Sequence, residues 1–175
     1  MTHELFPDSV QLEGPYRLDR MTQKQVPAVV SIMLASEPWM SYGFEGAVVE
    51  RFMAGSVEAG LARSLIHVME PDEDSPGAEE VIGVVVIHPG FLGGRYLEIL
   101  AISERHRGKT LGTQIINLLC RESPAHMRDL FVLVSLFNQP AVGFYEKQGF
   151  IDVGDLPGLI LPGKVERLIW LRFRN

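Results

Sequence analysis

Residues 97–113, LEILAISERHRGKTLGT, constrain the fold more than any other segment of the 175-residue chain. An apolar run leads through a basic turn directly into a helical pattern. The apolar residues of this pattern share one helical face: Leu111, Ile115, Leu118 and Leu119. The first backbone N–H groups of a helix have no intrahelical partners, and the helix dipole adds partial positive charge at that end. Such a strand-to-helix junction is suited to hold an anion such as phosphate.

The turn itself adds charge and backbone space. Arg105, Arg107 and Lys109 carry positive charges. Gly108 and Gly112 allow the backbone to approach a ligand closely. The segment matches neither G-x-x-x-x-G-K-[ST] nor G-x-G-x-x-G, so it is not one of the two common phosphate loops. From these residues alone, an anion site and an ordinary connection with solvated basic side chains both stay open.

The length of the chain fits one domain with a sizeable core. We interpret residues 1–175 as a single domain in which residues 1–15 form an N-terminal arm. The chain is 46% hydrophobic and 22% charged, as is typical of globular proteins. Its net charge of -6 disfavours binding to nucleic acid, which depends on many Lys and Arg contacts to phosphates. A small phosphorylated ligand fits the basic turn better.

Signals for a compartment or a membrane are weak. Cys120 is the one cysteine, so no intramolecular disulfide can form and nothing requires an oxidising compartment. The first residues, MTHELFPDSV, lack the basic and apolar regions of a signal peptide. No apolar run approaches the roughly 18 residues that a membrane helix needs. We expect a cytoplasmic protein whose partners include neither a membrane nor a nucleic acid.

Hydrophobic periodicity predicts the element order β-α-α-β-β-β-α-β-α-β-β. Strands are expected at residues 16–19, 64–69, 81–88, 96–103, 130–137, 150–153 and 165–173, and helices from about residues 22, 47, 111 and 139. The polar, acidic residues 71–80 are expected to form an exposed hairpin loop. This order indicates an α/β fold, with a mixed sheet of about seven strands and helices on both faces.

Two separated segments carry a resemblance to a known family. Residues 107–112, RGKTLG, resemble the R/Q-x-x-G-x-G/A pyrophosphate motif of the GNAT superfamily of acyl-CoA-dependent N-acetyltransferases. Residues 138–150, NQPAVGFYEKQGF, resemble that family's N-x-x-A-x-x-[FL]-Y-x-K-x-G-F segment. The element order is similar too, so the resemblance covers about residues 16–173. It implies a GNAT-like domain with a splayed central strand pair.

The resemblance implies that acetyl-CoA is the co-substrate and lies where the strand with residues 100–102 splays from the strand ending near Leu136. The backbone of residues 100–102 would pair with the pantetheine arm, a use that suits an unpaired strand edge. Residues 107–113 would hold the pyrophosphate, Asn138 would contact the amide arm, and Tyr145 would lie near the sulfur. The implied cofactor-binding residues are Leu100, Ala101, Ile102, Arg107, Gly108, Lys109, Thr110, Leu111, Gly112, Thr113, Asn138 and Lys147.

Three of the implied residues leave alternatives open. Asn138 fits both a cofactor contact and the N-cap of the helix that begins at Gln139, because Asn caps helices well. Tyr145 could instead anchor the core through its aromatic ring. Thr110 stands where the family motif usually has a glycine. Its hydroxyl could contact a phosphate oxygen or cap the helix, or its side chain could crowd the cofactor.

Acetyl transfer to an amine needs a neutral nucleophile, a polarised thioester carbonyl and a proton for the departing thiolate. Deprotonating a lysine amine at pH 7 costs about 4.6 kcal/mol, against about 1 kcal/mol for an α-amine, so a base is valuable for lysine. Glu98 is the candidate base, because it lies two residues from Leu100 and is expected on the same strand face. It could equally be an exposed strand carboxylate. Tyr145 is the candidate acid for the thiolate.

The acceptor is the least determined part of this interpretation. By the same resemblance, the segment between the first two helices forms one wall of the acceptor cleft, and we expect Glu37, Trp39 and Tyr42 to contact the substrate. Acidic and aromatic side chains suit a cationic amine, although these residues could also close the core. The apolar loop at residues 156–162 is expected to form the opposite wall or a contact in a homodimer.

No metal site is predicted, because the five histidines are scattered and show neither H-x-x-x-H nor H-E-x-x-H spacing. The function that the sequence favours is direct transfer of an acetyl group from acetyl-CoA to a primary amine. The acceptor would be a protein N-terminus, a lysine or a small amine. A non-catalytic module that binds or senses acyl-CoA is the alternative, and a structural partner domain with a vestigial cleft is a third hypothesis.

Overall fold

The computed structural model describes residues 8–70, 77–124 and 126–172. Its strands are β1 (Ser9–Gln11), β2 (Tyr16–Arg20), β3 (Ala62–Val68), β4 (Glu79–Phe91), β5 (Gly94–Ile102), β6 (Asp129–Ser135), β7 (Ile151–Pro157) and β8 (Val165–Arg172). Its helices are α1 (Val26–Leu34), α2 (Trp39–Tyr42), α3 (Gly46–Glu58), α4 (Leu111–Arg121) and α5 (Gln139–Lys147), with two short 3-10 turns, η1 (Gln23–Gln25) and η2 (Glu104–His106).

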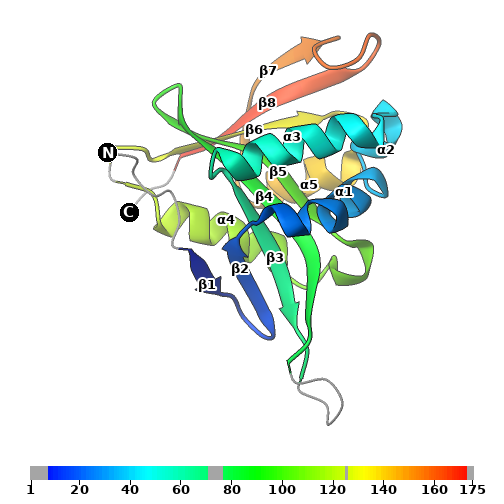
Figure 1. Ribbon diagram of the computed structural model, residues 1–175. Helices are drawn as coiled ribbons and strands as arrows, with labels where there is room; N and C mark the ends of the chain where they lie inside the picture. The colour runs from blue at the N-terminus through cyan, green and yellow to red at the C-terminus, as the bar shows by residue number, and fades with distance from the viewer. Residues whose placement is uncertain (1–7, 71–76, 125, 173–175) are drawn as a thin grey trace.

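The described strands form one sheet of eight strands in the order β1-β2-β3-β4-β5-β6-β8-β7. Neighbouring strands are antiparallel except for β5 and β6, which run parallel in the centre of the sheet. In Figure 1, α1 and α3 lie on the near face of the sheet, and α4 and α5 lie behind it. The chain therefore has three layers, with helices on both faces of a mixed sheet.

Each face of the sheet has its own buried core. On the α4 and α5 face, Leu111 and Ile115 of the predicted helical stripe pack with Tyr145 against the strands. On the other face, Val29 of α1 and Met53 of α3 are fully buried. The periodic apolar residues that indicated these helices are thus the residues that attach them to the sheet.

The structure confirms the predicted α/β class, mixed sheet and helical layers. The sheet has eight strands rather than about seven, because residues 9–11 of the predicted N-terminal arm form β1 and pair with β2. β7 extends to Pro157, so the predicted loop at 156–162 begins later than expected. The loop predicted at 71–80 falls largely on residues 71–76, outside the described residues. None of the described helices combines the length and apolarity that crossing a membrane requires.

Candidate active site

The central parallel strands separate halfway along their length. In the described residues, β5 and β6 pair only from Arg95↔Leu130 to Leu97↔Val132. Beyond that point β5 stays paired with β4 as far as Ile102, and β6 stays paired with β8 as far as Ser135. Residues 98–102 therefore present an edge toward β6 at which an extended ligand can add main-chain hydrogen bonds. This is the splayed pair that the resemblance implied.

The basic turn lies at the end of β5 and opens into α4. Residues 107–110 are exposed, and Gly108 has a positive φ of 72° with nothing within 4 Å of the Cβ position. Leu111 is 1% exposed, so only its backbone can contact a ligand. The start of an 11-residue helix beside an exposed basic turn is an arrangement suited to an anion.

Thr110 adopts the backbone conformation that explains why a glycine is usual at this motif position. It precedes the first residue of α4 with φ 61° and ψ -1°, in the left-handed region that a β-branched residue rarely occupies. Its hydroxyl donates to the carbonyl of Lys109 at 2.7 Å and accepts from Nε2 of Gln114 at 3.1 Å. The hydroxyl is thus hydrogen-bonded both to the basic turn, through Lys109, and to α4, through Gln114.

Arg107 connects the turn to two other elements. Its Nε donates to the carbonyl oxygen of Ile102 at 2.9 Å, and its Nη2 donates to Oγ of Ser36 at 2.7 Å. Ser36 is buried two residues after the end of α1 and donates in turn to the carbonyl of Ile32 at 2.7 Å. The guanidinium in this conformation fixes the turn against β5 and α1, which leaves exposed backbone and Lys109 for an anion.

The two sequence motifs meet at the contact between α4 and α5. A Cβ on Gly112 would lie 2.9 Å from Cζ of Phe144, so a hydrogen at this position lets the helices approach. Nε2 of Gln148 donates to Oγ1 of Thr113 at 3.1 Å and joins the same helices. Gly112, expected to make room for a ligand, therefore makes room for Phe144 in this structure.

Asn138 is the N-cap residue just before α5, and Tyr145 lies in the second half of that helix. Oδ1 of Asn138 accepts from the backbone N–H of Ala141 at 3.4 Å, so its capping role is observed. Tyr145 is 7% exposed, and burial raises the pKa of its hydroxyl well above the usual range, with a smaller contribution from Tyr96. Its hydroxyl thus keeps its proton near neutral pH, and the raised pKa makes it a weaker acid than an ordinary tyrosine. Lys147 is exposed in the last turn of the helix.

Glu98 lies at a β-bulge, and this corrects the strand face predicted for it. Val86 pairs with Ile99 and Ile87 pairs with Leu97, which leaves Glu98 as the extra residue on β5. The extra residue breaks the alternation of side chains along β5. Leu97, rather than Glu98, therefore lies on the same sheet face as Leu100, in the core beneath α4 and α5.

The Glu98 carboxylate instead meets a histidine on the neighbouring strand. Its Oε2 lies 2.6 Å from Nε2 of His88. His88 follows Ile87 on β4 and therefore points to the sheet face covered by α1 and α3. The candidate base and the candidate acid Tyr145 consequently belong to opposite faces of the sheet at the splayed strands.

The expected acceptor residues come from α2 and the residue just before it. Glu37 accepts from the backbone N–H of Ser41 at 3.3 Å and from its hydroxyl at 2.7 Å, so it caps this short helix. Trp39 is half-buried against the α1 and α3 core. Tyr42 is 7% exposed, and its ring lies 5.5 Å from that of Phe137, centroid to centroid.

Tyr42 forms a buried polar cluster with two residues that the sequence did not single out. Its hydroxyl donates to Oε1 of Glu166 at 2.7 Å and lies 2.5 Å from Oγ of Ser135. Burial is the main cause that raises the pKa of this hydroxyl above its usual range, and the hydrogen bond to Glu166 adds to it. Glu166 is 1% exposed and pairs in register with Ser135, the last residue of β6. The sequence held one sign of this cluster, namely a carboxylate among the apolar residues of the strand VERLIWLR (β8).

The loop after β7 lies beside this cluster. The backbone N–H of Ile160 donates to Oε2 of Glu166 at 3.5 Å, and Nζ of Lys164 lies 4.7 Å from the centroid of the Phe137 ring. The loop predicted as the opposite wall is thus attached to the polar cluster that holds Tyr42. Leu159 and Ile160 remain 56% and 40% exposed.

The three-layer fold, with parallel central strands that part beside a basic helix start, is the arrangement that the resemblance to acyl-CoA-dependent acetyltransferases implied. Residues 38–150 match the model of the acetyltransferase (GNAT) family, and the chain belongs to that family. It is an acetyl-CoA-dependent acetyltransferase.

Solved structures of similar fold cover nearly the whole chain. A GNAT-family acetyltransferase from Bacillus cereus ATCC 10987 has a TM-score of 0.66 and 14% identity over 93% of this chain and 100% of its own. Naa50 from Arabidopsis thaliana has a TM-score of 0.64 and 15% identity over 91% and 100%. A chimera of spermidine N-acetyltransferase SpeG from Vibrio cholerae and hSSAT has a TM-score of 0.64 and 17% identity over 91% and 96%. A search of curated protein sequences finds no match.

Proposed function

We propose that the protein transfers the acetyl group of acetyl-CoA directly to a primary amine at the splayed strands. The observation that carries this proposal is that three features occur together at the splayed strands. They are the open edge of β5, Glu98 on one face of the sheet and Tyr145 on the other face. Glu98 would take the proton of the amine, directly or through a water. Tyr145 would protonate the departing thiolate, and its hydroxyl carries the proton that this step needs near neutral pH.

The cofactor would use the backbone of residues 100–102 for its pantetheine arm and the turn at residues 107–113 for its pyrophosphate. The fit rests on exposed backbone next to a helix start, with Lys109 exposed beside it. Asn138, whose oxygen caps α5, retains its amide NH₂ as a donor for the amide arm. Lys147, exposed in the last turn of α5, would contact the more distant part of the cofactor.

The acceptor would enter on the side of α2 and be held by Glu37, Trp39 and Tyr42, since carboxylate and aromatic groups suit an ammonium group. Two structural neighbours indicate which amines to test first. Naa50 was solved with the bisubstrate analogue CoA-Ac-MVNAL, and another neighbour is a spermidine N-acetyltransferase chimera. Protein N-termini, lysine peptides and polyamines are therefore the first acceptors to screen. A cytoplasmic location and a homodimer through the loop at residues 156–162 belong to the same proposal.

The test compares Tyr145→Phe with wild type in thiol release from acetyl-CoA and in acetyl-CoA affinity. With the best acceptor of the screen, we expect kcat to fall about 10²-fold while affinity changes little, because general-acid catalysis acts only in the transition state. Tyr16→Phe, on β2 away from the splayed strands, is the matched control and should retain wild-type turnover. Equal losses of turnover and affinity, or no loss, would contradict the acid role. Binding of acetyl-CoA without transfer to any acceptor would support the sensing module instead.

A further inference from the structure

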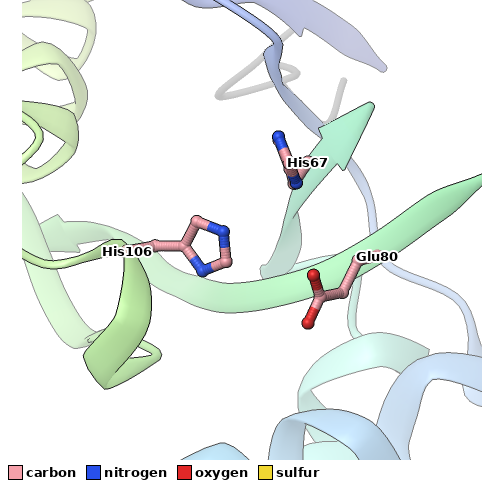
Figure 2. Close-up of side chains that lie close together, drawn as sticks. All are labelled: His67, Glu80 and His106. Atoms are coloured by element: carbon pink, nitrogen blue, oxygen red, sulfur yellow. The ribbon is translucent and has the colours of Figure 1, made fainter. Parts of the chain in front are cut away.

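Three potential metal ligands converge outside the candidate active site. His67 comes from β3, Glu80 from β4 and His106 from η2, and Figure 2 shows the three side chains around one space. One ligand atom of each residue lies within 4.8 Å of the other two. The sequence predicted no metal site because these residues are far apart in the chain, whereas the fold places them together.

The backbone around this cluster holds its members in place. His67 and Glu80 are directly paired neighbours in the antiparallel β3–β4 ladder. The backbone N–H of His106 donates to the carbonyl of Ser103 at 2.9 Å, and that of Ser103 donates to the carbonyl of Ile82 on β4 at 2.7 Å. The turn that carries His106 is thus attached to the strand that carries Glu80, so the three ligands are positioned by main-chain hydrogen bonds.

Both imidazoles have a nitrogen available to a cation. Nδ1 of His106 lies 2.9 Å from Oγ of Ser103, which fixes the ring and leaves Nε2 for a metal. Nδ1 of His67 is buried and has no hydrogen-bond partner among the described residues. The Tyr16 ring packs beside both imidazoles, with centroids 5.3 Å from His67 and 6.1 Å from His106.

The carboxylate of Glu80 has one competing partner. Its Oε1 accepts from Nη2 of Arg105 at 2.8 Å. The Arg105 side chain is 79% exposed, so water screens its charge and the ion pair contributes little. The second oxygen of Glu80 remains available to a metal ion.

We propose that His67, Glu80 and His106 bind a divalent transition-metal ion, with Zn²⁺ as the best match to two imidazoles and a carboxylate. A tetrahedral ion at about 2.0 to 2.1 Å from each ligand places ligand atoms about 3.3 Å apart. The ligand atoms now lie within 4.8 Å of one another, so side-chain rotations would have to bring them to that spacing when the ion binds. Three protein ligands leave the fourth position to water. The ion would join the β3–β4 hairpin to the turn that leads into the Arg107 segment.

The test is Zn²⁺ titration of chelator-treated full-length protein against a chromophoric competitor, with the melting temperature as a second readout. We expect one Zn²⁺ per chain and a rise in melting temperature on binding. Substitution by Co²⁺ should give the visible absorption bands of a four-coordinate ion. His67→Gln and Glu80→Gln should each weaken the affinity at least about tenfold, as loss of a ligand requires.

Glu79→Gln is the matched control, because Glu79 is the adjacent carboxylate on β4 and pairs with Arg17 at 2.8 Å. It should bind Zn²⁺ like the wild type. The melting temperatures of the metal-free variants show that each has folded. Wild-type protein without saturable binding of one Zn²⁺ overturns the proposal. So does binding that survives both His67→Gln and Glu80→Gln, since the ion would then occupy other ligands.

Discussion

The carboxylate of Glu98 and the imidazole of His88 meet between β5 and β4, with Oε2 and Nε2 2.6 Å apart. The β-bulge makes this contact, because Glu98 is the residue of β5 without a register partner on β4. Their side chains are 27% and 37% exposed, so water can reach the pair. A carboxylate bonded to an imidazole and open to water can pass a proton outward, which is what the base in acetyl transfer must do.

Glu98→Gln should therefore reduce acetylation of lysine peptides more than acetylation of peptide N-termini. Deprotonation at pH 7 costs about 4.6 kcal/mol for lysine and about 1 kcal/mol for an α-amine, so the lysine reaction depends more on a base. We expect a loss of about 10²-fold for lysine acceptors and under about tenfold for α-amines, measured as kcat/KM. Glu104→Gln, an exposed carboxylate in η2, is the control and should change neither. A uniform loss for both acceptor classes would argue that Glu98 positions the strand instead.

Much of the fold could be predicted because helical periodicity and apolar strand runs are local signals. The residues of the α4 stripe are buried as their spacing required, and the turn at residues 107–110 is exposed before a helix as its composition indicated. The face of the sheet to which the Glu98 side chain points could not be predicted. Alternation assumes two residues per repeat, and one inserted residue reverses every side chain beyond it without a mark in composition.

The buried cluster of Tyr42, Ser135 and Glu166 was beyond prediction for a different reason. The antiparallel pairing of β6 with β8 brings Ser135 and Glu166 together, and Tyr42 joins them from α2 through hydrogen bonds. Buried carboxylates are rare unless they are hydrogen-bonded, so Glu166 in an apolar strand was a weak sign of a partner. Nothing in the sequence identified that partner as Tyr42.

Thr110→Gly should stabilise the protein relative to Thr110→Ala. Thr110 has φ 61°, where glycine avoids the cost of about 1 to 2 kcal/mol that a Cβ incurs. The alanine variant also loses the hydroxyl bonds to Lys109 and Gln114 but keeps the Cβ, so it isolates the backbone effect. We expect the glycine variant to exceed the alanine variant by about 1 kcal/mol in urea unfolding, after the greater chain entropy of glycine is included.

Acetyl-CoA affinity in the same two variants decides what Thr110 does for the cofactor. A large gain in Thr110→Gly would show that the side chain crowds the pyrophosphate. A loss in both variants would show that the hydroxyl contacts it. Equal stability of the two variants would contradict the strain assigned to Thr110.

Cys120 should make the stability fall with rising pH in the alkaline range. Burial raises the pKa of its thiol to about 11, against an ordinary thiol value of about 8.5 in an unfolded chain. At a pH between these two pKa values, the unfolded chain has lost the thiol proton and the folded chain still holds it. The folded state thus binds more protons, and the free energy of unfolding falls as pH rises through this window. Below about pH 8.5 the contribution of the thiol is fully retained.

The measurement is urea unfolding of wild type and Cys120→Ala at several values between pH 8 and pH 10. We expect the free energy of unfolding to decline less steeply in Cys120→Ala, since other groups that titrate in this range are shared by both proteins. Alkylation of Cys120 in the folded protein should likewise be slow at pH 8 and accelerate with pH, because the thiolate is the reactive form. Identical pH slopes would show that the thiol titrates alike in both states.

Gly112→Ala and Gly143→Ala should have opposite effects although both replace a helical glycine. Alanine favours a helix interior over glycine by about 0.5 to 1 kcal/mol, and a Cβ at Gly143 meets nothing within 4 Å. At Gly112 the added Cβ would lie 2.9 Å from the Phe144 ring. That ring also packs against Tyr145 at a centroid distance of 5.1 Å, which limits its movement.

We expect Gly143→Ala to raise the free energy of unfolding by about 0.5 to 1 kcal/mol and Gly112→Ala to lower it by about 1 to 3 kcal/mol. Because Phe144 also packs against Tyr145, Gly112→Ala should reduce turnover as well. Adding Phe144→Leu to Gly112→Ala removes ring atoms at the contact and should restore part of the stability, as a double-mutant cycle would show. If Gly112→Ala stabilises the protein as Gly143→Ala does, close packing of α4 on α5 is not the reason for glycine at position 112.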